Sequence, residues 1–169
     1  MCNQVLHHLI SIAGQADFSP VNRLIEEARR VLRPLGVLII NTSSHRQLYD
    51  GFWWDDLIPD AVGRIAERFP SIEIITSMLE EAGFQKVSTI IPMGAVIQGR
   101  NYLDPIGPLK KAFRDGDSTW SLATDKELER AQARVQSMNR GEDMKDYLEA
   151  REDLRKKTGQ VTFIFSYKK

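Results

Sequence analysis

A run of four aliphatic residues that ends abruptly in a polar segment is the feature that most restricts the fold. Residues 37–40 read Val-Leu-Ile-Ile, with no polar residue among them. A strand covered on both faces of a parallel sheet has this pattern, whereas a strand with one face in water alternates apolar and polar residues. Together with the helical patterns around it, the run predicts an α/β fold in which residues 37–40 lie at the sheet centre.

Helix signals precede this strand and recur after it. Ser19 and Pro20 are a typical helix start, and apolar residues at three-and-four spacing extend the helix to the Pro-Leu-Gly at 34–36. Ser77 with Glu80 fits a capping box for a short helix over residues 78–82, before a strand over 86–91. The sequence thus predicts two helix-then-strand units.

The second half of the chain reads as a connection, two helices and a last strand. Residues 93–124 are irregular and contain several Pro and Gly residues, and a helix interrupted by Pro59 precedes them at about 55–69. Thr124 and Glu127 fit another capping box, and a charged helix follows at about 143–157. Residues 160–167 are strongly strand-like.

Charge and composition exclude several classes of protein. The 169 residues carry 23 Lys and Arg against 23 Asp and Glu, so no long-range field would gather nucleic acid or anionic lipid. No stretch approaches the roughly 20 apolar residues of a membrane span, and the single cysteine, Cys2, cannot form an internal disulfide. We expect one domain over residues 1–169, in a reducing, cytoplasmic compartment.

The polar segment after the central strand is the first candidate site. Asn41, Thr42, Ser43, Ser44 and His45 follow one another at a strand end, and ligands of open α/β sheets bind at the carboxyl ends of strands. These side chains could orient a polar acceptor, or they could simply form a turn and a helix cap. Both interpretations stay open at this point.

A cluster of aromatic residues follows the polar segment. Tyr49, Phe52, Trp53 and Trp54 lie within six residues, more than one amphipathic helix face requires. They indicate either an interface or an apolar lid that covers a bound acceptor, because such sites are concave and rich in aromatic side chains. The alternative is a helix packed on the sheet.

Two blocks of sequence resemble a known enzyme family. Residues 2–9, Cys-Asn-Gln-Val-Leu-His-His-Leu, precede the segment at 24–42, which contains the phrase E-x-x-R-V-L-R-P-x-G. The pair resembles class I S-adenosylmethionine-dependent methyltransferases of the small-molecule type, which includes the quinone-biosynthesis C-methyltransferases. The resemblance implies a partial Rossmann-like fold running from the end of strand four to an antiparallel strand seven at 160–167. A helical insertion at about 100–158 would precede that last strand.

The resemblance also implies an activity and a set of residues. Methyl transfer from S-adenosylmethionine to a small-molecule acceptor would use Asn3, Gln4 and His7 on the cofactor side. His7 and His8 would be the candidate catalytic residues. Because methyl transfer from a sulfonium is an in-line displacement, such residues chiefly align donor and acceptor, and a base acts only where the acceptor loses a proton. The alternative for the histidines is one exposed ring and one helix-start residue.

The acceptor side would be formed by residues from the polar segment and the aromatic cluster. They are Asn41, Ser43, His45, Trp53 and Trp54. We expect no metal site, because three histidines without Cys or acidic residues at ligand spacing make a poor ligand set.

The first three strands of the family are not found in the sequence, and with them the Gly-rich loop and the acidic residue that hold the cofactor. Activity would therefore need a longer chain, a homodimer or a completing protein partner. The alternatives are a non-catalytic pseudo-methyltransferase that acts as an interaction module, or a truncated gene product. A bare sheet edge would favour pairing with another chain.

Overall fold

In this computed structural model the chain forms two compact units. The structure describes residues 1–11, 17–141 and 143–169. The first unit, here called the sheet unit, contains residues 1–45, 67–92 and 161–169. The second, here called the helical unit, contains residues 46–66 and 93–160. The single-domain organisation expected from the sequence remains a prediction.

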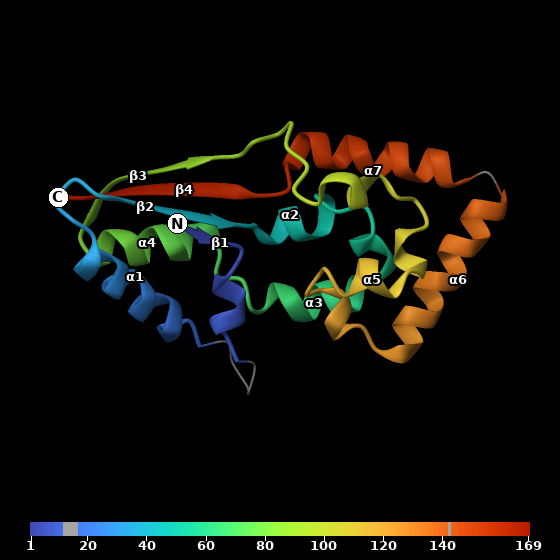
Figure 1. Cartoon of the computed structure of the whole chain (residues 1–169), viewed down its shortest axis with the longest axis horizontal. Helices are drawn as coiled ribbons and strands as arrows, with labels where there is room; N and C mark the ends of the chain where they lie inside the picture. Colours follow the sequence, from blue (N-terminus) through green and yellow to red (C-terminus); the bar gives the residue numbers. More distant parts are fainter. Residues whose placement is uncertain (12–16, 142) are drawn as a thin grey trace. The chain divides into compact units, whose positions relative to one another are not determined.

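A four-stranded mixed sheet forms the sheet unit (Figure 1). Its strands are β1 (Cys2–Asn3), β2 (Val37–Thr42), β3 (Phe84–Ile90) and β4 (Thr162–Lys168), in the order β1-β2-β4-β3. β1 runs parallel to β2, whereas β4 is antiparallel to both of its neighbours, β2 and β3. The α/β class and the antiparallel direction of the last strand, both expected from the sequence, are confirmed.

β2 is an inner strand, as the aliphatic run predicts. It pairs with β1 on one side and with β4 on the other. Leu38 and Ile40 are buried, Ile39 is half-buried and Val37, at the start of the strand, is exposed. Strand pairing extends two residues beyond the aliphatic run, to Thr42, so the first polar residues of the candidate site belong to the strand itself.

Two helices and the sheet share one apolar core. α1 (Ser19–Val31) contributes Val21 and Ile25, and α4 (Ile72–Glu81) contributes Ile75 and Leu79. These side chains pack with strand residues that include Leu38, Ile40, Phe84 and Ile164. Figure 1 shows both helices beside the sheet of this unit. The one-turn 3-10 helix η1 (Leu6–Leu9) adds Leu6 to the same core.

Two helix starts differ from the sequence prediction. Ser71, not Ser77, caps α4, because its hydroxyl accepts a hydrogen bond from the Ile74 amide at 3.3 Å. Ser77 lies inside the helix, and the predicted start at 78 was wrong because the capping-box pattern also fits residues within a helix. At α1, the side chain of Asp17 accepts the Ser19 amide at 2.9 Å, so Ser19 is the first helical residue rather than the cap.

Helices of different lengths make up most of the helical unit. Its longer elements are α2 (His45–Asp50), which begins at the last residue of the sheet unit, α3 (Pro59–Ala66), α6 (Asp125–Gly141) and α7 (Met144–Thr158). Short turns connect them: η2 (Asp55–Leu57), η3 (Gly99–Leu103), η4 (Gly107–Leu109), α5 (Lys111–Arg114) and η5 (Trp120–Leu122). The predicted interruption at Pro59 is confirmed, since this residue begins α3.

An aromatic core holds the helical unit together. Phe52, Trp53, Trp54, Tyr102 and Trp120 are all buried in it. α6 contributes Ala131 and Val135, with Leu128 and Met138 packed against the cluster. The apolar stripe predicted for this helix is therefore its buried face. Across the described ranges, no helix is both long and apolar enough to cross a membrane.

Candidate functional site

The polar residues at the ends of β1 and β2 lie side by side. The two strands are parallel, and Asn3 is in register with Asn41. The Asn41 side-chain amide donates to Asn3 Oδ1 at 2.7 Å. Because the carboxyl ends of parallel strands meet at one edge, residues 38 positions apart in the sequence form one polar surface.

Gln4 extends this surface toward the segment after β2. Its Nε2 donates to Asn41 Oδ1 and to Ser43 Oγ, each at 3.4 Å. Its backbone amide donates to the Asn41 carbonyl at 2.9 Å, which continues the strand pairing by one residue. Asn3, Gln4, Asn41 and Ser43 therefore form a connected set, here called the strand-end network.

The backbone of Gln4 is in an unusual conformation. Its φ of +52° lies in the left-handed region, which residues other than glycine adopt uncommonly. Strain of this kind concentrates at binding and catalytic sites, where the surrounding structure holds it. The turn at Gln4 leads directly into η1, which carries both histidines of the candidate site.

His7 packs against a phenylalanine from another part of the chain. Its ring stacks on that of Phe69 with centroids 4.5 Å apart and an interplanar angle of 13°. Its ring centroid also lies 4.0 Å from that of His8. His7 is buried, whereas His8 is exposed, so the two neighbouring imidazoles have different environments.

The environment of His7 keeps its ring neutral at physiological pH. Burial is the main cause, and the positive charges of His8 and Arg68 add to it, so that the pKa of His7 falls to about 4. A base with so low a pKa accepts a proton poorly near pH 7. Its low pKa therefore makes His7 a poor proton acceptor near pH 7.

His45 joins the same region through the backbone of Phe69. Its Nε2 donates a hydrogen bond to the Phe69 carbonyl oxygen at 2.8 Å. Phe69 thus contacts His7 through its ring and His45 through its backbone. The sequence did not indicate this residue, because nothing in the segment around 69 marks it as a neighbour of two distant histidines.

All the site residues predicted from 1–9 and 41–45 belong to the sheet unit. The structure brings Asn3, Gln4, Asn41 and Ser43 into one network, and it links His7 to His8 and His45 to Phe69. The arrangement offers neutral donors and acceptors next to a neutral buried imidazole.

The two tryptophans predicted to cover an acceptor lie in the core of the helical unit. Trp53 donates from Nε1 to the Tyr102 carbonyl at 2.9 Å, and Trp54 donates to Asp117 Oδ2 at 3.1 Å. Their exposed fractions are 2% and 1%. These contacts explain the burial of both side chains by packing within the helical unit. A role in acceptor binding stays a prediction.

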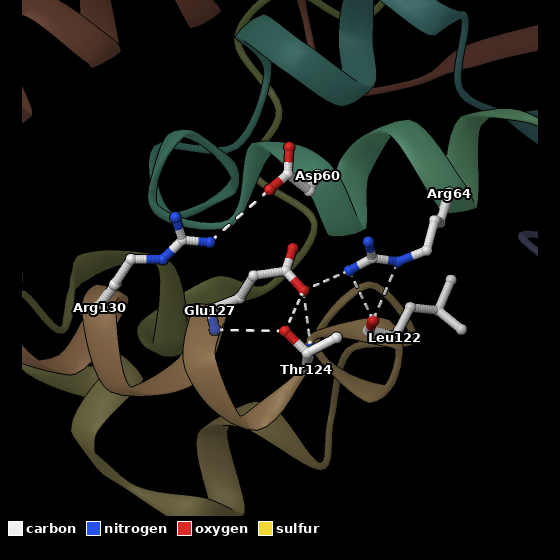
Figure 2. A network of polar contacts seen from close by, with 6 residues as sticks. All are labelled: Asp60, Arg64, Leu122, Thr124, Glu127 and Arg130. Atoms are coloured by element: carbon white, nitrogen blue, oxygen red, sulfur yellow. Dashed lines mark hydrogen bonds and ion pairs between the residues drawn. The ribbon is translucent and has the colours of Figure 1, made fainter.

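A second polar site lies wholly within the helical unit, between α3 and α6. Three carboxylates and two guanidinium groups line it, those of Asp56, Asp60, Glu127, Arg130 and Arg134. Figure 2 shows Asp60 and Arg64 on α3 facing Glu127 and Arg130 on α6. The pocket has a volume of about 220 Å³. We refer to it below as the α3–α6 pocket.

This pocket was not predicted from the sequence. The signal was the capping box at Thr124, which fixes the Glu127 carboxylate at the start of α6. The contact of this carboxylate with Arg64 depends on α3, which lies more than 60 residues away in the sequence. Within the ranges that the structure covers, no group of His, Cys, Asp and Glu side chains could hold a metal ion.

The fold is similar to that of a solved structure from Anabaena variabilis ATCC 29413. That crystal structure is described as a "putative methyltransferase from antibiotic biosynthesis pathway". The TM-score is 0.67 at 22% sequence identity, and the alignment covers 86% of this chain and 60% of the Anabaena protein. This chain therefore spans about 60% of the length of that neighbour. At this identity the likeness establishes a shared methyltransferase-like fold.

No family model matches the sequence, and no curated protein matches it significantly.

Proposed function

We propose that the chain takes part in methyl transfer from S-adenosylmethionine to a small-molecule acceptor. The observation that carries this proposal is the strand-end network, Asn3, Gln4, Asn41 and Ser43, at the carboxyl ends of two neighbouring parallel strands. The likeness to the Anabaena methyltransferase-like structure supports the same assignment at the level of the fold. The resemblance of residues 2–9 and 24–42 to class I methyltransferases supports it independently.

The residues present fit this cofactor. Carboxamide groups, as in Asn3 and Gln4, could bind the amino-acid and ribose groups of S-adenosylmethionine. Because its pKa is low, His7 would add no positive charge to a site for a cationic cofactor. When bound, the cofactor supplies an electrophilic methyl group. The residues of this chain would hold and orient it.

The acceptor would be held by residues at the end of β2, by those that follow it and by η1. Ser43 and Asn41 offer hydroxyl and carboxamide groups, and His45 is fixed by the Phe69 carbonyl. The exposed imidazole of His8 would accept a proton from acceptors that must lose one. His7, neutral and stacked on Phe69, would hold η1 in place and so position its neighbour.

The remaining cofactor contacts implied by the family resemblance would come from a longer chain, a homodimer or a companion protein. The rival function is a non-catalytic pseudo-methyltransferase that serves as an interaction module. The two functions differ in whether S-adenosylmethionine binds.

Calorimetric titration with S-adenosylmethionine, combined with light scattering, separates them. Saturable micromolar binding by a monodisperse species is expected, and Gln4→Ala should weaken it about tenfold through loss of the strand-end network. Gln136→Ala, on the exposed surface of α6, is the matched control and should bind like the parent chain. A stable dimer without binding would overturn the enzymatic proposal in favour of the interaction module.

A further inference from the structure

The carboxylate of Glu127 has two oxygens with very different surroundings. Oε2 accepts hydrogen bonds from the Thr124 amide at 2.8 Å, the Thr124 hydroxyl at 2.7 Å and Arg64 at 2.5 Å. Oε1 is buried and has no hydrogen-bond partner among the residues that the structure describes. In Figure 2 it points away from Thr124 and Arg64. The residue as a whole is only 4% exposed.

Glu127 is ionised in spite of this burial. Burial raises its pKa, but the hydrogen bonds from Thr124 and Arg64 outweigh it and lower the pKa to about 2. A buried, ionised oxygen without a donor carries a large desolvation cost. Glu127 also lines the α3–α6 pocket. A hydrogen-bond donor that enters the pocket would offset this cost.

Neither arginine of the pocket donates to Oε1. Arg134 pairs instead with Asp56 at 2.9 Å and lies over the Tyr147 ring at 5.1 Å from its centroid. Arg130 pairs only loosely with Asp60, at 3.7 Å, and both side chains are largely exposed.

Arg64 pairs with Glu127 through Oε2, so every lining carboxylate has an arginine partner. The acceptors that stay open to a ligand are the loosely paired Asp60 carboxylate and Oε1 of Glu127. Two carboxylate acceptors favour a cation with N–H donors.

The lining and the volume of the pocket favour an organic cation over a metal ion. Leu57 and Pro59 line it beside the charged groups, so one wall is apolar. The carboxylates are not gathered into a group that could hold a metal, within the described ranges. A volume of about 220 Å³ accommodates a small amine with a short aliphatic chain.

We propose that the α3–α6 pocket binds a small primary ammonium ion. Its N–H groups donate to Glu127 Oε1 and to the Asp60 carboxylate, and its alkyl chain packs on Leu57. The loose Arg130–Asp60 pair opens to admit it. This site is independent of the strand-end network, so its test does not depend on methyl transfer.

An NMR titration of the full chain with n-butylammonium chloride tests the proposal. Saturable shifts are expected at the amides of Glu127 and Leu57. Butan-1-ol lacks the charge and tetramethylammonium chloride lacks N–H donors, so both should bind at least about tenfold more weakly. Equal responses to n-butylammonium and tetramethylammonium would overturn the proposal, because they would reflect charge screening alone.

Two variants and a control locate the site. Glu127→Gln and Asp60→Asn should each lower the affinity for n-butylammonium, the former by at least about tenfold. Asp60 is exposed at the surface of α3, so its variant keeps the test valid if Glu127→Gln fails to fold. Asp115→Asn removes a comparable exposed carboxylate paired with Lys111, and it should bind like the parent chain. Parent-like binding by Asp60→Asn would overturn the proposal. It would mean that water or a rotated Arg130, and not the ammonium ion, satisfies Oε1.

Discussion

Thr124 and Glu127 exchange hydrogen bonds across the first turn of α6. The Glu127 amide donates to Thr124 Oγ1 at 3.3 Å, and the Thr124 amide donates back to Glu127 Oε2 at 2.8 Å. This is the capping box predicted from the sequence, and it satisfies backbone groups that the helix itself leaves without a partner. Arg64 of α3 adds a tertiary contact to the same oxygen, so one carboxylate both starts α6 and joins it to α3.

Loss of the Thr124 hydroxyl should weaken the helical unit. Thr124→Ala removes the acceptor of the Glu127 amide and one donor to Oε2, and it should lower the free energy of unfolding by about 1 kcal/mol. Urea denaturation followed by circular dichroism measures the change. Thr124→Ser keeps a hydroxyl and should recover most of the loss. Equal destabilisation by both variants would mean that the methyl group, not the cap, is responsible.

Stability should fall in acid as Glu127 takes up a proton. The folded-state pKa of about 2 lies below the ordinary value of 4.5, so the ionised form stabilises the native state above pH 4.5. This contribution is lost as pH falls from about 4.5 toward 2, and it should amount to roughly 3 kcal/mol. The free energy of unfolding of Glu127→Gln, measured over the same range, should depend less steeply on pH. An unchanged pH dependence of the free energy of unfolding in Glu127→Gln would contradict the low pKa of Glu127.

His7 should give a separate pH dependence at higher pH. Its folded-state pKa of about 4 lies below the ordinary 6.5, so the unfolded chain binds the proton first as pH falls. The free energy of unfolding should therefore decrease by roughly 3 kcal/mol as pH is lowered from 6.5 to about 4. His7→Phe removes the titrating group and should flatten the curve in this window, as urea denaturation at several pH values would show.

The charge of His8 contributes to the low pKa of its neighbour. His8→Gln removes one of the positive charges that lower the pKa of His7, so that pKa should rise while burial keeps it below 6.5. An NMR titration of the His7 Cε1 proton measures the shift. Arg68→Gln should act in the same direction, because Arg68 is the other charged cause. A pKa unaffected by both variants would leave burial as the sole cause.

Trp54 should be essential for the helical unit. It is buried, donates to Asp117 and makes an edge contact with the Phe113 ring at 5.2 Å between centroids. Trp54→Ala should cost about 3 to 5 kcal/mol through the lost burial and the cavity that remains. Trp54→Phe keeps part of the aromatic packing and should cost less. Urea denaturation compares the two variants, and a near-neutral Trp54→Ala would favour a lid over a core residue.

Residues 37–40 show which features of the fold the sequence alone could predict. Their unbroken aliphatic pattern predicted an inner strand, and the polar residues that follow predicted where a site would lie. Both kinds of signal are local: side-chain periodicity and the chemistry of a strand end depend on neighbours in the chain. The capping box of α6 was predictable for the same reason, and Ser77 shows that the same local pattern can also fit a helix interior.

Contacts between distant segments could not be predicted in this way. Phe69 joins His7 to His45, and Arg64 meets Glu127, only because turns and helix packing bring these segments together. The same packing buries Trp53 and Trp54 in the core of the helical unit. An aromatic cluster has the same composition in a lid, an interface or a core, so the sequence alone could not predict this burial.

The sequence by itself determined the α/β class, the inner strand at 37–40, the antiparallel last strand implied by resemblance and the start of α6, because each depends on local patterning. Only the tertiary structure decided which side chains meet. It joined the residues of the strand-end network, neutralised His7 by burying it, and left one oxygen of Glu127 without a partner in the α3–α6 pocket. Burial and pairing are properties of the packed chain, because they depend on which distant atoms replace water around each group.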